Sequence, residues 1–163
     1  MSRINPHIIA ALLCGLMTVF ASDRVATADS KTSDGWEAGS EYNKLYDPKE
    51  RDQIKGDIVK LTTVTPLPGM APGTALILDE GGGDKVVVHI CPESFASGRE
   101  IGLKRGEWVK IKGAWAEIGD ETVFIAAKIK KDGGFSYKVR LTSDGTPFWT
   151  MSAELLAKER ASD

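Results

Sequence analysis

The sequence predicts an all-β domain, a five-stranded Greek-key barrel followed by a short C-terminal strand and helix. Between residues 53 and 130, apolar and polar residues alternate in five short segments, and this period of two is typical of strands. Glycine- and proline-rich turns separate the segments. A chain of 163 residues, with 42% hydrophobic and 27% charged residues, has the size and composition of one soluble domain.

The first 28 residues have the layout of a secretory signal peptide. Arg3 gives a positively charged start, residues 8–20 form an apolar run, and Ala26-Thr27-Ala28 places small residues before a cleavage point. The apolar run is too short to cross a bilayer comfortably as a helix. We therefore expect cleavage after Ala28, export to the periplasm, and no membrane span in the mature chain.

Cleavage would change both the charge and the cysteine count. Lys and Arg would fall from 21 to 19 and Asp and Glu from 23 to 22, which leaves a net charge of -3. His89 and Cys91 would be the only histidine and the only cysteine. A single thiol cannot form an internal disulfide, so Cys91 is expected to be buried, bound to a metal or paired with another chain.

The start of the mature chain differs from the rest in its amino-acid composition. Residues 29–41 are rich in Gly, Ser and Asp, with Trp36 as the one aromatic residue, and they predict a flexible leader. The domain is then expected to span residues 42–149. It opens with Tyr42, Leu45 and Tyr46, which we expect to clip onto the barrel.

The strands follow one another with distinct connections. We expect them at residues 53–59, 74–79, 85–90, 108–115 and 122–130. Residues 65–73 predict a loop, and Gly81-Gly82-Gly83 predicts a hairpin turn between the second and third strands. An added strand is expected near residues 137–141, and residues 150–163 predict a helical tail with Ser152 as its N-cap.

The connection between the third and fourth strands indicates which barrel this is. Residues 92–105 lack alternation and predict a short helix or an ordered loop. Five strands alone also fit an SH3-like barrel. A non-strand segment at this place favours an OB-fold, a partly open five-stranded Greek-key barrel.

The same residues resemble a known class of proteins. The pattern is Y-D-P at 46–48, I-x-G-x-I-V at 54–59, P-x-x-G-M at 66–70, V-H-I-C-P at 88–92, R-G-E-W-V-K-I-K-G at 105–113 and I-A-A-K-I at 125–129. It resembles small exported bacterial OB-fold proteins of the periplasmic type over residues 42–149. The resemblance implies fold and location rather than an activity. Cys91 stands where that pattern has glycine, so a role for Cys91 would be peculiar to this chain.

His89 and Cys91 are the sharpest chemical feature. Residues two apart on a strand share a face, and Val86, Val88 and Ile90 look like the core face of the third strand. His89 and Cys91 would then point outward, on the face where OB-folds bind ligands. Imidazole and thiolate suit Cu or Zn, and Met70 in the preceding loop could add a thioether. The other chemical interpretation is a Cys–His nucleophilic pair. The simplest interpretation is that His89 and Cys91 are inert neighbours at the end of a strand.

A basic stripe is the second candidate. Lys110 and Lys112 share a face of the fourth strand, and Lys128 and Lys130 share a face of the fifth. Neighbouring strands would join them into one patch, with Trp108 beside it for stacking. Such a patch could bind nucleic acid or another anionic polymer, although solvated lysines also protect sheet faces from aggregation.

The sequence thus favours a non-enzymatic periplasmic binding or accessory module. We expect its ligand, a protein partner in an exported complex, on the outer face of the second and third strands and the loop at 65–73. No cofactor is predicted firmly. A Cu or Zn protein using His89, Cys91 and Met70 is the first alternative. Binding of a polyanion by Lys110, Lys112, Lys128, Lys130 and Trp108 is the second, and nucleic acid is disfavoured by the net negative charge.

Overall fold

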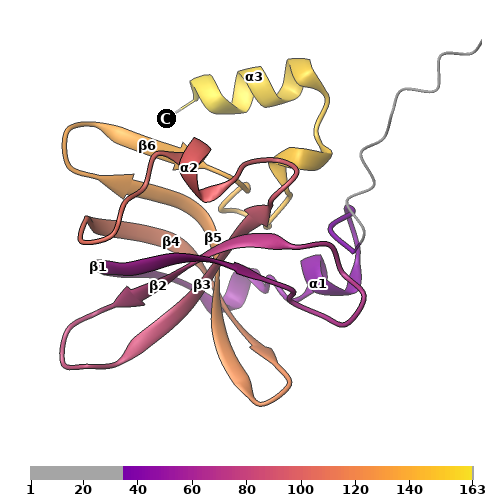
Figure 1. The fold of residues 1–163 in the computed structure, drawn as a ribbon. Coiled ribbons are helices and arrows are strands. Elements are labelled where there is room, and N and C mark those ends of the chain that lie inside the picture. Colours follow the sequence, from indigo (N-terminus) through magenta and orange to yellow (C-terminus); the bar gives the residue numbers. More distant parts are fainter. Residues whose placement is uncertain (1–34, 163) are drawn as a thin grey trace, which may run out of the picture.

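The computed structural model describes residues 35–162, which form a β-barrel with a helix beside one end (Figure 1). The predicted signal peptide at residues 1–28 lies outside the described residues. The elements in chain order are α1 (Glu41–Lys44), the 3-10 helix η1 (Pro48–Glu50), β1 (Arg51–Val64), β2 (Gly73–Asp79), β3 (Lys85–Pro92), α2 (Gly98–Ile101), β4 (Trp108–Ile118), β5 (Glu121–Lys131), β6 (Phe135–Lys138), the 3-10 helix η2 (Phe148–Thr150) and α3 (Ala153–Ala161).

The pairing of the strands is that of an OB-fold. The sheet order is β3-β2-β1-β4-β5-β6, and a parallel pairing of β3 with β5 closes the first five strands into a ring. β6 adds one antiparallel strand outside the ring, along β5. α2 lies between β3 and β4, where the sequence predicts a non-strand segment. The predicted five-stranded Greek-key barrel is therefore confirmed, with its added strand and helix.

Glycines and bulges allow the strands to curve into a ring. A Cβ atom at Gly56 would collide with the backbone carbonyl of Asp79, and one at Gly113 with that of Ile125. Only glycine permits backbones to come so close. The register also slips by one residue in three strands, at Val59, Ile90 and Ala127. Such β-bulges increase twist and bend a sheet toward closure.

One hydrophobic cluster fills the barrel. We call it the barrel interior, and its side chains are at most 4% exposed. Alternation accounts for most of it, since Ile54 and Ile58 of β1 face inward while Lys55 and Asp57 are exposed. Its members are Ile54, Ile58, Leu76, Leu78, Val88, Ile90, Cys91, Ala96, Ile101, Leu103, Val109, Ile111, Phe124, Ala126, Ile129 and Val139.

A second cluster packs the N-terminal segment against the outside of the strands. We call it the outer core, and it comprises Trp36, Tyr42, Tyr46, Ala114, Ala116, Val123, Ile125 and Ala127. The expected clip is thus present, and α1 lies against the side of the barrel (Figure 1).

The outer core includes residues before position 42, so the folded domain starts earlier than the sequence predicts. Trp36 is fully buried, and its indole Nε1 donates a hydrogen bond to the Ala71 carbonyl over 2.8 Å. The prediction of a flexible leader up to residue 41 is therefore wrong for residues 35–41. One large aromatic side chain gains enough from burial to order a polar, glycine-rich segment around it.

The C-terminal tail is helical and packs lightly. Ser152 caps α3, as predicted, because its hydroxyl accepts a hydrogen bond from the Leu155 amide. No residue of α3 is fully buried. Its ties to the barrel include a hydrogen bond from Lys138 Nζ to the Glu159 carbonyl, 3.1 Å long, and the Arg160 guanidinium over the Phe95 ring. Among the described residues, no helix has the length and apolarity needed to cross a membrane.

Candidate ligand-binding site

A hollow of about 290 Å³ opens on the outer side of the barrel. We call it the β2–β3 hollow. The end of β1, the loop after it, β2, β3 and the turn between β4 and β5 all contribute. OB-folds bind their ligands with these surfaces, so the hollow lies where the fold predicts a site. Its lining residues are Thr62, Thr63, Val64, Thr65, Pro66, Ile77, Val87, His89, Ile118, Glu121 and Val123.

The lining combines aliphatic side chains with a few hydrogen-bonding groups. The polar members are three threonines, His89 and Glu121, and the others are aliphatic. This lining contains no lysine or arginine, and its one ring is the His89 imidazole. Cations that could pair with phosphate are therefore missing from the lining, and so is a platform for stacking bases or sugars.

His89 is a buried, neutral histidine. It is 4% exposed, and its Nδ1 lies 3.2 Å from the hydroxyl of Tyr42. Burial, aided by the nearby Arg140 cation, lowers the pKa of His89 to about 4. Burial also raises the pKa of Tyr42 to about 12, so the phenol keeps its proton. A Tyr42 hydroxyl that donates to Nδ1 leaves the imidazole proton on Nε2, where it is available as a donor.

Arg140 is the third polar group of this region. It is 2% exposed, and Nη1 donates to Asn43 Oδ1 over 2.6 Å and to the Gly145 carbonyl over 3.2 Å. The guanidinium lies 4.5 Å from the centre of the Trp149 ring, a cation–π contact. Its Nε and Nη2 atoms have no hydrogen-bond partner within residues 35–162. Burial lowers the pKa of Arg140, and the nearby Tyr42 and Tyr46 partly oppose this shift.

Cys91 does not share a face with His89, so the prediction that both point outward is wrong. The register pairs His89 with Ala75 and Cys91 with Thr74, which leaves Ile90 as a bulge between them. The bulge breaks the alternation and turns Cys91 into the barrel interior, where it is fully buried. Its Sγ donates to the Ala96 carbonyl over 3.4 Å, and burial raises the pKa of the thiol to about 12.

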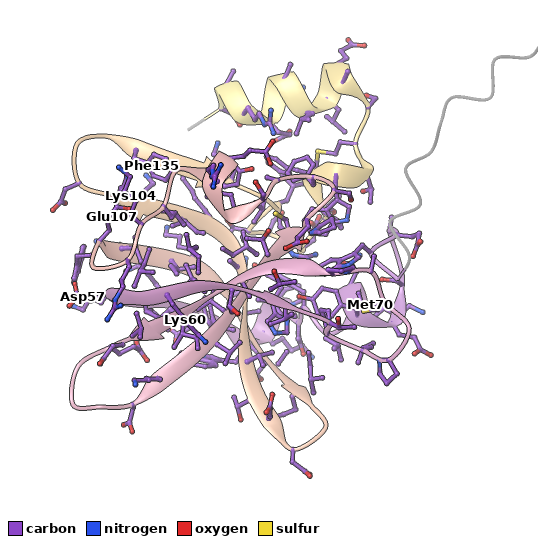
Figure 2. All side chains as sticks on the ribbon, viewed as in Figure 1. Asp57, Lys60, Met70, Lys104, Glu107 and Phe135 are labelled. Atoms are coloured by element: carbon purple, nitrogen blue, oxygen red, sulfur yellow. The ribbon has the colours of Figure 1, made fainter. Side chains whose placement is uncertain are left out.

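The geometry for a metal site at these residues is therefore absent. His89 borders the outer core, Cys91 is inside the barrel, and Met70 packs on the outer core beside Gly35. Met70 lies on the α1 side of the molecule (Figure 2). Within the described part of the chain, no group of three or more His, Cys, Asp or Glu residues could hold a metal ion. A Cys–His nucleophilic pair is ruled out at these residues too. The two side chains do not face each other, and a thiol with so high a pKa is not ionised.

The four predicted lysines are brought together. Lys110 lies directly opposite Lys130, and Lys112 opposite Lys128, across the β4–β5 pair. They line a separate hollow of about 210 Å³ with Gln53. Trp108 is 43% exposed at the end of the same face.

Sequence reasoning missed Tyr42 and Arg140 as partners of His89. Tyr42 was assigned only to packing, and Arg140 falls on the polar side of an alternating segment, where solvent exposure is the ordinary expectation. Neither has a local signal, because their contacts span 47 residues from Tyr42 to His89 and 97 from Asn43 to Arg140. The run Thr62-Thr63-Val64-Thr65, with three hydroxyls at the start of the first loop, was the available signal for the hollow.

Comparison with known proteins places the barrel in a family. The model of the MamS/MamX magnetosome protein family matches residues 50–135, from the end of η1 to the start of β6. A search of the curated proteins gives no match.

Among solved structures, a chain in the crystal structure of the S. pombe Stn1-ten1 complex is similar, with 20% sequence identity and a TM-score of 0.40. The alignment covers 50% of this chain and 57% of that chain, so it spans about half of each.

Proposed function

Because the chain belongs to the MamS/MamX magnetosome protein family, we propose that it is a non-enzymatic accessory module of the magnetosome. In this proposal the module binds a protein partner in the β2–β3 hollow. The observation that supports it most directly is the place and chemistry of that hollow. It lies at the ligand-binding surface of the OB-fold, and its lining is aliphatic with hydroxyls and a neutral imidazole.

The lining suits a polypeptide better than the other ligands that OB-folds bind. Aliphatic side chains such as Ile77 and Val87 can pack against an apolar side chain of the partner. Thr63 and Thr65 hydroxyls and the His89 imidazole can bond peptide groups. A nucleic acid needs cations and stacking rings, and an oligosaccharide gains from aromatic platforms, and the lining offers neither.

A non-enzymatic role is supported by the state of the reactive groups. The Cys91 thiol has a pKa near 12 and is buried, and the His89 imidazole has a pKa near 4. Neither is close to the neutral pKa that suits a general base or a nucleophile at physiological pH. Glu121 is exposed at the start of β5, as solvated acids usually are.

The binding proposal can be tested by blocking the hollow. Thr65 is exposed in the loop after β1, so Thr65→Arg would place a long cation in the hollow and leave the outer core intact. Ser143→Arg, on an exposed turn that does not line the hollow, is the matched control. Tagged protein would be purified from its own cells at moderate salt. A polypeptide that co-purifies with wild type and Ser143→Arg, and not with Thr65→Arg, supports the proposal.

Two results would contradict it. A partner retained by Thr65→Arg would bind elsewhere on the barrel. A bare monomer from gently prepared wild-type cells would remove the ground for a stable protein partner.

We further propose that the module works in the periplasm after cleavage at Ala28, as in the exported proteins that the sequence resembles. The support is the signal-like composition of residues 1–28. Fractionation followed by intact mass tests it. A periplasmic species that begins at Asp29 agrees with the proposal, and a full-length species retained in the cytoplasm contradicts it.

A further inference from the structure

Six lysines form a regular array on the outside of four neighbouring strands. One row across the sheet contains Lys55, Lys110 and Lys130, which lie opposite one another on β1, β4 and β5. The next row contains Lys112, Lys128 and Lys138 on β4, β5 and β6. Neighbouring strands are about 4.8 Å apart, and alternate residues of one strand are about 6.8 Å apart. The Cα atoms of the six lysines are therefore regularly spaced.

This arrangement of like charges favours a negatively charged ligand. Like charges directly opposite on neighbouring strands destabilise a sheet. The whole chain has a net charge of -2, so six lysines on one face represent a strong segregation of charge. At the β1 end of this face lies Asp57, opposite Trp108, and Glu107 lies near the same end of the barrel, as Figure 2 shows. Glu107 is already paired with Lys131 over 2.9 Å.

Two hollows on this face share a wall. The first, about 210 Å³, is lined by Gln53 and four lysines. The second, about 270 Å³, is lined by Lys112, Lys128, Lys138, Arg140, Leu141, Thr142, Phe148, Glu159 and Ser162. Lys112 and Lys128 line both, so the hollows are adjacent, and we call them together the basic trough. Glu159 is the one acid in either lining, against five lysines and one arginine.

We propose that the basic trough binds an extended acidic segment of a polypeptide, at a surface separate from the β2–β3 hollow. A strand-like peptide places alternate side chains about 6.8 Å apart, which matches the spacing of the lysines along β4 and β5. Alternating carboxylates would meet successive rows, and the hydroxyl of Thr142 and the amide of Gln53 can accept or donate hydrogen bonds at either end. The charge complementarity also speeds association.

An acidic peptide fits this face better than a nucleic acid does. Proteins that bind single strands combine basic grooves with several aromatic rings on which successive bases stack. Trp108 is the one exposed aromatic side chain in the described part of the chain, and it lies opposite Asp57, whose carboxylate repels phosphate. The linings of both hollows contain Phe148 alone as an aromatic residue, and Phe148 is buried.

The test measures binding of a fluorescein-labelled synthetic peptide of alternating glutamate and serine to the purified protein by fluorescence anisotropy at low salt. A glutamine–serine peptide and a single-stranded oligothymidine of equal charge are the comparison probes. The test variant combines Lys112→Gln with Lys128→Gln, because these lysines line both hollows. Lys60→Gln with Lys85→Gln removes the same charge from exposed positions that line neither hollow. Lys112→Arg with Lys128→Arg keeps the charge.

We expect the acidic peptide to bind wild type, the Lys60/Lys85 control and the arginine variant with similar affinity. The Lys112/Lys128 glutamine variant should bind about tenfold more weakly, and added salt should weaken all of them. Equal affinity of both glutamine variants would move the contact away from the trough. Tighter binding of oligothymidine would make nucleic acid the ligand, and no binding of the acidic peptide at low salt would overturn the proposal. Matching unfolding curves verify that each variant is folded.

Discussion

The barrel interior and the outer core share the same strands but differ in what they bury. The interior is aliphatic, with Phe124 and the Cys91 thiol as its exceptions. The outer core adds the aromatic rings of Trp36, Tyr42 and Tyr46, and it borders two of the three buried polar residues, His89 and Arg140. His89 and Arg140 are thus buried where the N-terminal segment covers the strands, whereas Thr74 donates a hydrogen bond to the Ala96 carbonyl. The interior closes the barrel, whereas the outer core also fixes a residue that lines the β2–β3 hollow.

The family match makes the same division. Residues 50–135 contain all five strands of the ring but neither Tyr42 nor Arg140. The N-terminal segment and the residues after β6 therefore supply the partners of His89 from outside the part that defines the family. If the outer core and the barrel interior are separate in this way, a substitution can destabilise the segment that covers the strands without opening the barrel.

Removing Trp36 should have the largest effect. Its side chain is fully buried, contacts the Tyr42 and Trp149 rings edge-on, and leaves a large cavity when truncated. Trp36→Ala should lower the free energy of unfolding by about 3–5 kcal/mol, measured by denaturant titration. Trp108→Ala removes a side chain that is 43% exposed and should change it by no more than about 0.5 kcal/mol. If Trp36→Ala and Trp108→Ala lowered the free energy of unfolding by the same small amount, the segment at residues 35–46 would not be part of the folded domain.

The second prediction concerns the loss of folding stability at acid pH that His89 causes in the region of the outer core. Its pKa is about 4 in the folded state and 6.5 in an exposed chain, so the unfolded state binds the extra proton between these values. Its contribution is complete above pH 6.5 and is lost as pH falls toward 4, by about 3 kcal/mol in all. His89→Gln, which cannot titrate but can accept from Tyr42, should flatten the fall in stability over this range.

Other acids do not disturb this measurement. The pKa values of Asp52 and Glu107 are also lowered, the first mainly by the Gln53 amide and the second mainly by Lys131. Both are present in the wild type and in His89→Gln, so their effects cancel in the difference. Parallel pH profiles for the two proteins would show that His89 is hydrated in the folded state.

Arg140 tests whether the outer core depends on charge or on packing. Arg140→Ala removes the contact with Trp149 and the hydrogen bond to Asn43, and it should cost about 2–3 kcal/mol in thermal or denaturant unfolding. Arg140→Met keeps most of the volume and removes two nitrogen atoms that have no partner among residues 35–162. It should recover most of the loss. A methionine variant as unstable as the alanine variant would assign the stabilisation to the hydrogen bonds instead.

Cys91 provides the smallest effect and belongs to the interior. Cys91→Ser exchanges a soft thiol for a hydroxyl in an aliphatic environment and should cost about 1 kcal/mol, because the hydroxyl can still donate to Ala96. The folded wild type should react with a thiol reagent far more slowly than the unfolded chain, given the buried thiol and its pKa near 12. Rapid labelling of the native protein would place Cys91 outside the barrel.

Prediction from sequence succeeded where alternation and turns are regular. The five strands, the loop after β1, the glycine turn before β3 and the Ser152 cap all follow from local pattern. The grouping of Lys110, Lys112, Lys128 and Lys130 on one face also followed, because adjacent strands of a meander are neighbours. It failed at Cys91, where one bulged residue, Ile90, reverses every face assignment beyond it. It failed again at Trp36, whose burial depends on a surface that the segment itself cannot show.

By itself, the sequence determined the barrel, because a two-residue period and well-placed glycines act through contacts between neighbours in the chain. It also determined the charge of the lysine face, because side chains in matching register on adjacent strands point to the same side of the sheet. Only the tertiary structure decided that His89 is neutral, that Arg140 is buried beside it, and that Cys91 is sealed inside. Those outcomes depend on desolvation by residues far along the chain, and a local pattern does not contain that information.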